Sequence, residues 1–146
     1  MSPAIASSAL ASFIALSIGG ICTSGYLVWK HHRSQKTKAA PLVCPLNHDC
    51  STVTESKWST IFYFRNETLG LLYYVAMFMG GLLLAFAPAL IPALPLFLLI
   101  GAGMALLFSF FLVYLQAFII KDYCFYCLIS AIISLLLVVN SFLIFV

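Results

Sequence analysis

Four of the five cysteines in this sequence form two closely spaced pairs, Cys44 with Cys50 and Cys124 with Cys127. Positions i and i+3 share one face of a helix, so a helix that begins at Cys124 places the two sulfurs of the second pair one turn apart. The first turn of a helix favours a thiolate, because its amide groups and its dipole attract negative charge. This pattern is typical of a dithiol that opens and closes by thiol–disulfide exchange.

The same cysteines have two alternative interpretations. As a structural disulfide, the short ring from Cys44 to Cys50 would contribute only about 2.4 kcal/mol in the chain-entropy model, and the ring from Cys124 to Cys127 about 1.9 kcal/mol. Such small contributions favour a redox role over a structural one. A metal site is the second alternative, with nitrogen and sulfur ligands from Cys44, His48, Cys50 and the Cys124/Cys127 pair.

The composition is that of an integral membrane protein. Of 146 residues, 64% are hydrophobic and 8% are charged, whereas ordinary soluble domains carry about 25% charged residues. These values exclude a soluble enzyme and a disordered tail. The net charge of +3 arises from seven basic and four acidic side chains, which are too few for a surface that binds nucleic acid.

The charged residues divide the chain into apolar stretches. Three stretches contain no Asp, Glu, Lys or Arg: residues 1–29, 68–120 and 123–146. A membrane-spanning helix needs about 20 apolar residues, so the middle stretch is long enough for two, and its three prolines between residues 88 and 95 mark the break. We therefore expect four spans, at about residues 4–29, 68–87, 95–120 and 123–146.

These spans predict an all-α fold, an integral membrane four-transmembrane-helix bundle that forms one domain over residues 1–146. Four crossings put both termini and the proline-rich turn on one side. The functional loop 30–67 and the Lys121-Asp122 turn then share the other side with all charged residues and both cysteine pairs. Within that loop, the segment from Ser51 to Asn66 is expected to form a short helix on the membrane surface.

Small residues within the spans are expected to serve helix packing. Gly20 and Ser24 are four residues apart, as are Gly101 and Ala105, so each pair lies on one helix face and suits close approach. Cys22 lies in the middle of the first span, and we expect it to be a packing residue without a chemical role.

Two dithiols on one membrane face indicate a relay. Thiol–disulfide exchange passes oxidising equivalents from one pair to the other through a mixed disulfide. The electrons then need an acceptor that is reached from the bilayer, which points to a lipid-soluble quinone. Aromatic residues near the cysteines are compatible with a quinone, although interface or helix packing is the alternative for each of them. They are Trp58, Phe62, Tyr63, Tyr73, Tyr74, Tyr123, Phe125 and Tyr126.

Several short motifs together resemble the vitamin K epoxide reductase family. They are Cys44-x5-Cys50, Val53-x2-Ser56-x-Trp58, Asn66-x3-Gly70 with Tyr73-Tyr74, and Cys124-x2-Cys127 at the start of the fourth span. Each element alone is weak, but the combined spacing is specific and covers nearly the whole chain. The bacterial disulfide bond protein B family is similar in chemistry, but its Cys-x-x-Cys motif comes in the first loop, whereas here the motif comes last.

The resemblance implies an enzyme, a quinone-dependent thiol–disulfide oxidoreductase that reoxidises a thioredoxin-like protein and so supports disulfide formation. Cys124 and Cys127 would be the active-site pair, with Cys127 facing a ubiquinone, menaquinone or related ring. Cys44 would exchange with the partner protein and Cys50 with Cys124. The quinone-binding residues would be Asn66, through a hydrogen bond to a carbonyl, and Ser56, Trp58 and Tyr74.

One departure from the family concerns substrate choice. The vertebrate vitamin K enzymes have a tyrosine four residues after the last cysteine, where this chain has Ala131. The alanine favours simple quinone reduction over epoxide reduction. Many bacterial members also carry a fused thioredoxin-like domain. Since this chain ends at Val146, a separate thioredoxin-fold protein is the expected partner, in addition to membrane lipid.

Two rules disagree about which side of the membrane holds the cysteines. The resemblance implies the periplasm, the cell exterior or the endoplasmic reticulum lumen. The positive-inside rule finds seven Lys and Arg residues on the cysteine side and none on the other, and therefore predicts the cytoplasm. The alternative function is a non-enzymatic membrane protein with structural disulfides or a Cys/His metal site. A transporter is disfavoured because the spans carry no charge.

Overall fold

The computed structural model describes residues 3–37, 60–61 and 64–146. Within these residues the fold is almost entirely helical, and four helices are long and apolar enough to cross a membrane. The predicted all-α, four-span architecture of an integral membrane protein is therefore confirmed. Several predictions lie outside the described residues: Cys44, Cys50, Ser56, Trp58 and the first part of the surface helix expected from Ser51.

The first helix, α1 (Pro3–Thr37), is longer than the sequence predicts. The expected span ends at residue 29, but the helix continues for about two turns through the basic residues, because Lys, Arg and Gln are good helix formers and no Pro or Gly interrupts them. Its 35 residues rise about 52 Å, which exceeds a hydrocarbon core of about 30 Å. Trp29 is exposed, with the Arg33 guanidinium 5.3 Å from its ring centroid, an arrangement typical of a membrane interface.

The proline-rich turn separates the next two helices, as predicted. α3 (Asn66–Phe86) ends before Pro88, and α4 (Leu94–Tyr114) begins with Pro95 in its first turn, where the missing amide donor has no helical partner to lose. α4 passes directly into a π-helix, η2 (Leu115–Ile120), and α5 (Phe125–Phe145) forms the last span.

A short antiparallel hairpin precedes α3. β1 (Thr60–Ile61) pairs with β2 (Phe64–Arg65), with Thr60 opposite Arg65 and Ile61 opposite Phe64. The prediction that a surface helix extends through these residues is wrong. The β-branched and aromatic side chains of this segment favour extended backbone, and pairing satisfies backbone groups at the point where the chain turns into α3.

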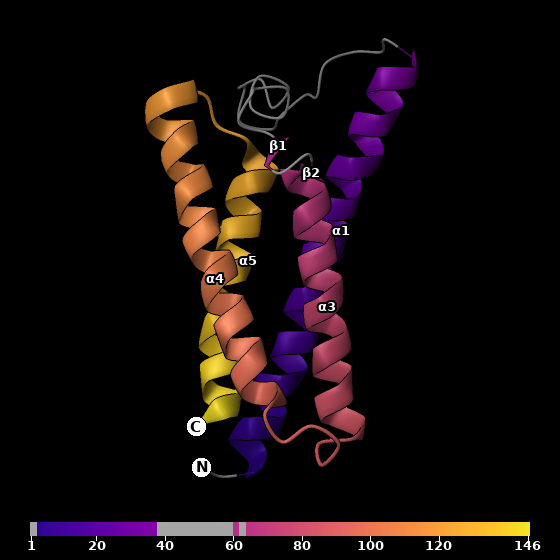
Figure 1. Ribbon diagram of the computed structural model, residues 1–146, viewed down its shortest axis with the longest axis vertical. Coiled ribbons are helices and arrows are strands. Elements are labelled where there is room, and N and C mark those ends of the chain that lie inside the picture. The colour runs from indigo at the N-terminus through magenta and orange to yellow at the C-terminus, as the bar shows by residue number, and fades with distance from the viewer. Residues whose placement is uncertain (1–2, 38–59, 62–63) are drawn as a thin grey trace.

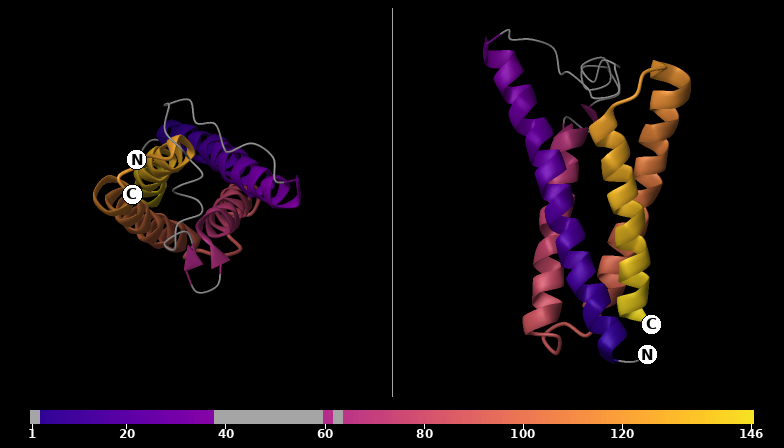
Figure 2. Two further views of the ribbon diagram at one scale, coloured as in Figure 1. Left: turned by 90° about the horizontal axis from the view of Figure 1, so that it is seen from above. Right: turned by 180° about the vertical axis from the view of Figure 1, so that it is seen from behind.

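The two ends of the bundle hold different segments of the chain. Both termini and the α3–α4 turn lie at one end (Figure 1). The C-terminal end of α1, the hairpin and the connection from η2 to α5 lie at the other end, and seen from above the four helices surround a common axis (Figure 2). This is the predicted arrangement. It brings the start of α5, with Cys124, to the same end as the start of α3.

The core of the bundle depends on close helix approaches at glycines. Its fully buried side chains come from all four helices: Phe13, Tyr74, Met77, Leu98, Ala102 and Leu137. A Cβ atom at Gly20 would lie within about 2.2–2.4 Å of ring atoms of Tyr74, so α1 and α3 meet at that glycine. One turn later, Ser24 is buried and packs toward Gly70. The predicted packing role of Gly20 and Ser24 is therefore confirmed.

Candidate functional site

The Cys124/Cys127 pair lies where α5 begins. Cys124 is the residue that caps the helix N-terminus, with extended backbone (φ −94°, ψ 113°), and Cys127 lies one turn into the helix. Both are free thiols, and Cys124 is completely buried. The amide of Leu128 donates to the carbonyl of Cys124 at 3.1 Å, which forms the first helical turn over the pair. The predicted spacing of one helical turn between the two cysteines is therefore present.

Gln116 fixes the backbone of Cys124. Its side-chain oxygen Oε1 accepts a hydrogen bond from the Cys124 amide at 3.0 Å, and both residues are buried. Gln116 belongs to η2, and Lys121 in the connection to α5 has a left-handed backbone (φ 57°). π-Helical turns are frequent at functional sites. The π-helix and this connection thus place the buried side chain of Gln116 against the amide of Cys124. This contact was not predicted from the sequence.

The pKa of the Cys124 thiol is lowered. The hydrogen bond with the Cys127 thiol is the largest cause, burial opposes it, and the backbone amides of Cys127 and Tyr126 lower the pKa further. The carboxylate of Glu67 acts in the other direction and raises it. Cys124 is therefore the sulfur that this site prepares as a thiolate, as expected for a cysteine at a helix N-terminus.

Glu67 is a buried acidic residue at the start of α3. Its side chain accepts a hydrogen bond at 2.5 Å from Nε of Arg65, and it is 8% exposed. The sequence suggests Lys121 and Asp122 as the charges that act on Cys124, and Glu67 was not predicted. Glu67 acts on the cysteines electrostatically from α3, on the far side of the bundle from α5, and sequence spacing does not reveal this arrangement (Figure 2).

The predicted quinone-binding residues Asn66 and Tyr74 lie on α3. Asn66 is its first residue, and its side-chain oxygen Oδ1 is buried. Tyr74 is 1% exposed, and its hydroxyl donates to the carbonyl oxygen of Ser130 at 2.9 Å. The same hydroxyl lies 2.7 Å from Oγ of Ser130 and 3.2 Å from Oγ of Ser134. Tyr74 thus joins α3 to α5 one turn beyond Cys127, and the two serines were not predicted.

The aromatic residues around the cysteines pack between α1 and α5. The ring of Tyr126 lies 5.1 Å from that of Tyr26, and Phe125 packs edge-on against Tyr126 at 5.6 Å. Leu27 of α1 packs against Cys124. These contacts enclose the dithiol on the α1 side, where desolvation strengthens hydrogen bonds to the sulfur.

Cys22 differs from its prediction. The sequence analysis expects a small packing residue, but the side chain is exposed on α1. It lies two residues after Gly20 and therefore faces away from α3. Cys22 has no part in the dithiol site.

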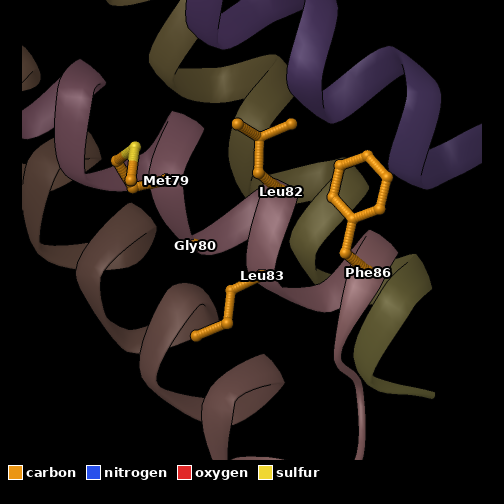
Figure 3. A pocket seen from close by; sticks show the side chains of 5 residues that line it. All are labelled: Met79, Gly80, Leu82, Leu83 and Phe86. Carbon is orange, nitrogen blue, oxygen red and sulfur yellow. The ribbon is translucent and has the colours of Figure 1, made fainter.

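The metal alternative depends on residues outside the described part. Cys44, His48 and Cys50 are not described. Among the residues that are, no three His, Cys, Asp or Glu side chains converge as a metal site would require. A separate apolar groove of about 390 Å³ lies toward the proline-turn end of α3 (Figure 3) and offers space for hydrocarbon but no chemistry. It is lined by Met79, Gly80, Leu82, Leu83 and Phe86.

Comparison with known proteins gives one family. The model of the vitamin K epoxide reductase family matches residues 11–142, which cover most of the first and last membrane-spanning helices, all of the other two and both cysteine pairs. No curated protein matches the chain.

Proposed function

The chain belongs to the vitamin K epoxide reductase family and is therefore a membrane-bound oxidoreductase of quinone-linked thiol chemistry, and we propose that its physiological reaction is the reoxidation of a separate thioredoxin-like protein. In this proposal Cys124 and Cys127 form the active-site pair. Cys44 and Cys50 form the shuttle pair between that site and the partner. The observation that supports it most directly is the placement of Cys124 and Cys127 one turn apart at the N-terminus of α5, with Cys124 buried.

The proposed reaction balances in electrons and protons. Oxidation of the Cys124/Cys127 dithiol breaks two S–H bonds, forms one S–S bond and releases two electrons and two protons. The quinone takes up both, and its two carbonyl oxygens become hydroxyls. Exchange with the shuttle pair then restores the dithiol, and the partner's dithiol becomes a disulfide.

The described residues supply distinct parts of this chemistry. Cys124, with its lowered pKa, is the thiolate that leaves when the Cys50–Cys124 mixed disulfide resolves to the Cys44–Cys50 disulfide. Cys127 donates a hydrogen bond to that thiolate and lies one turn deeper toward the bundle interior. Asn66, at the start of α3, would hold one quinone carbonyl. The aromatic rings of Tyr26, Phe125 and Tyr126 lie beside the dithiol, which suits a ring that partitions into lipid.

The proposal is tested with purified protein in detergent, decylubiquinone and a reduced thioredoxin. We expect the wild type to couple disulfide formation in the thioredoxin to loss of the quinone absorbance. Cys124→Ala and Cys127→Ala should each abolish quinone reduction, because the S–S bond cannot form. Cys44→Ala should block transfer from thioredoxin but retain oxidation of a small dithiol such as dithiothreitol.

A matched control uses the remaining cysteine. Cys22→Ala removes an exposed sulfur outside the site, and it should turn over like the wild type. Full quinone reduction by Cys127→Ala would defeat the assignment of the active-site pair. Stoichiometric zinc without quinone reduction in the wild type would favour the metal alternative.

A further inference from the structure

Tyr73 carries a buried hydroxyl without a hydrogen-bond partner among the described residues. Buried polar groups are nearly always paired, because removing them from water costs free energy that only a new hydrogen bond recovers. A tyrosine at this position rather than a phenylalanine therefore needs an explanation. A ligand that accepts a hydrogen bond inside the bundle supplies one.

The ring of Tyr73 packs beside Tyr74, which links α3 to α5. It packs against the buried core of the bundle, and its centroid is 4.9 Å from that of Tyr74. Tyr74 in turn is held by its hydroxyl on Ser130, which is one helical turn beyond Cys127 on α5. Tyr73 thus lies beside the residue that connects α3 to the cysteine-bearing face of α5.

Tyr73 also shares a helix face with Asn66. Seven residues separate them, which is nearly two full turns of an α-helix and about 10.5 Å along its axis. Helical side chains tilt toward the N-terminus, so a tyrosine at this position extends along α3 in the direction of Asn66. Two polar groups on one face then point to a ligand with two acceptors on opposite sides of a flat ring.

We propose that the Tyr73 hydroxyl donates a hydrogen bond to one carbonyl oxygen of a 1,4-quinone, opposite the carbonyl that Asn66 holds. The proposal rests on the quinone-linked function proposed above and adds a substrate-binding residue to it. The hydroxyl stabilises the negative charge that develops on this oxygen when the dithiol delivers electrons. Apolar side chains of the bundle would contact the ring without fixing its rotation, so this donor also sets its orientation.

The test is Tyr73→Phe, which removes the hydroxyl and keeps the ring. We expect the KM for decylubiquinone to rise by about two- to tenfold, the equivalent of one hydrogen bond. The unfolding temperature of the quinone-free variant should be unchanged or higher, because no bond within the protein is lost. Tyr74→Phe provides the contrast, since it breaks the contacts with Ser130 and should lower the unfolding temperature.

Tyr114→Phe is the matched control. Tyr114 is on α4 and 54% exposed, so the same chemical change there should alter neither KM nor unfolding temperature. A spectroscopic measurement complements the kinetics. Infrared difference spectra of carbonyl-labelled decylubiquinone should show one C=O stretch at higher frequency in Tyr73→Phe than in the wild type, because the hydrogen bond that weakens this double bond is absent.

The outcomes separate this inference from the proposed function. A wild type that oxidises dithiols without reducing decylubiquinone refutes the function. A wild type that reduces it, together with a Tyr73→Phe variant of unchanged KM and unchanged C=O stretch, overturns only the role of Tyr73. A lower unfolding temperature of quinone-free Tyr73→Phe would also overturn it, since the hydroxyl would then be bonded within the protein.

Discussion

Opposing influences act on the pKa of the Cys124 thiol, and their balance decides which of the two sulfurs is the better thiolate. Burial and the Glu67 carboxylate raise its pKa, whereas the Cys127 thiol and two backbone amides lower it, and the lowering prevails. The two cysteines are therefore unequal, although the motif presents them symmetrically. The capping position of Cys124 explains the inequality, because it directs the amides of the first turn at one sulfur only.

Cys127→Ala should raise the pKa of Cys124. The hydrogen bond with the Cys127 thiol is the largest cause of the lowered pKa, so the loss of this donor should raise the pKa. At neutral pH the variant should hold less thiolate and exchange more slowly. The measurement is the pH dependence of the thiolate ultraviolet absorbance in protein whose Cys22, Cys44 and Cys50 are replaced by Ala.

Glu67→Gln should lower the pKa of Cys124, since it removes the carboxylate that disfavours the Cys124 thiolate. Asn140→Ala, which breaks an exposed hydrogen bond far along α5, is the control and should leave the titration unchanged. Coincident titrations of Cys124 with and without Cys127 would contradict the assigned cause.

At the residue scale the sequence predicts the reacting groups but not their neighbours. The i, i+3 spacing of Cys124 and Cys127 is local, so it is correctly predicted from the motif. Gln116 and Glu67 come from other elements, and their approach depends on the π-helix and on the packing of α3. A polar residue inside an apolar span, as Gln116 is, is the signal that could have found the first of them.

The helices themselves illustrate what a sequence determines at the element scale. The bilayer requires about 20 apolar residues per crossing, so stretches without charge predict α3, α4 and α5 to within a few residues. The hairpin and η2 were not predicted, because short elements depend on tertiary packing as much as on propensity. The basic end of α1 was taken for a loop because charge excludes residues from lipid but not from a helix.

Gly20→Ala should destabilise the bundle. Its new Cβ would overlap the Tyr74 ring at about 2.2 Å, and Tyr74 cannot move aside without losing its bonds to Ser130. Overpacking of this kind costs about 1–3 kcal/mol. Thermal unfolding in detergent measures the effect, and quinone reduction should fall with it because Tyr74 lies beside the proposed site.

Gly103→Ala is the matched control for this prediction. No atom lies within 4 Å of the position that its Cβ would occupy, and alanine is the better helix former by about 0.5–1 kcal/mol. The variant should therefore be as stable as the wild type or more so. Equal unfolding temperatures for Gly20→Ala and Gly103→Ala would show that α1 and α3 do not meet closely at Gly20.

In the whole molecule, the charged and the purely apolar features lie at opposite ends of the bundle. The basic end of α1, the Arg65–Glu67 ion pair, Lys121 and the dithiol lie at one end. The opposite end holds the proline turn and the apolar groove on α3. Among the described residues, this end carries no Asp, Glu, Lys or Arg. This polarity was predicted from charge positions alone, because charged side chains cannot stay inside lipid.

The even number of crossings has a practical consequence for work in cells. A reporter enzyme fused to either terminus emerges across the bilayer from the thiols, so it samples the opposite compartment (Figure 1). One signal is the activity of a carboxy-terminal alkaline phosphatase, which is active only outside the cytoplasm. The other is labelling of Cys44 and Cys50 by an impermeant maleimide. We expect these two signals to be mutually exclusive in the same cells. Whichever of the two signals appears identifies the compartment that the cysteine pairs face, and the appearance of both would refute the four-crossing topology.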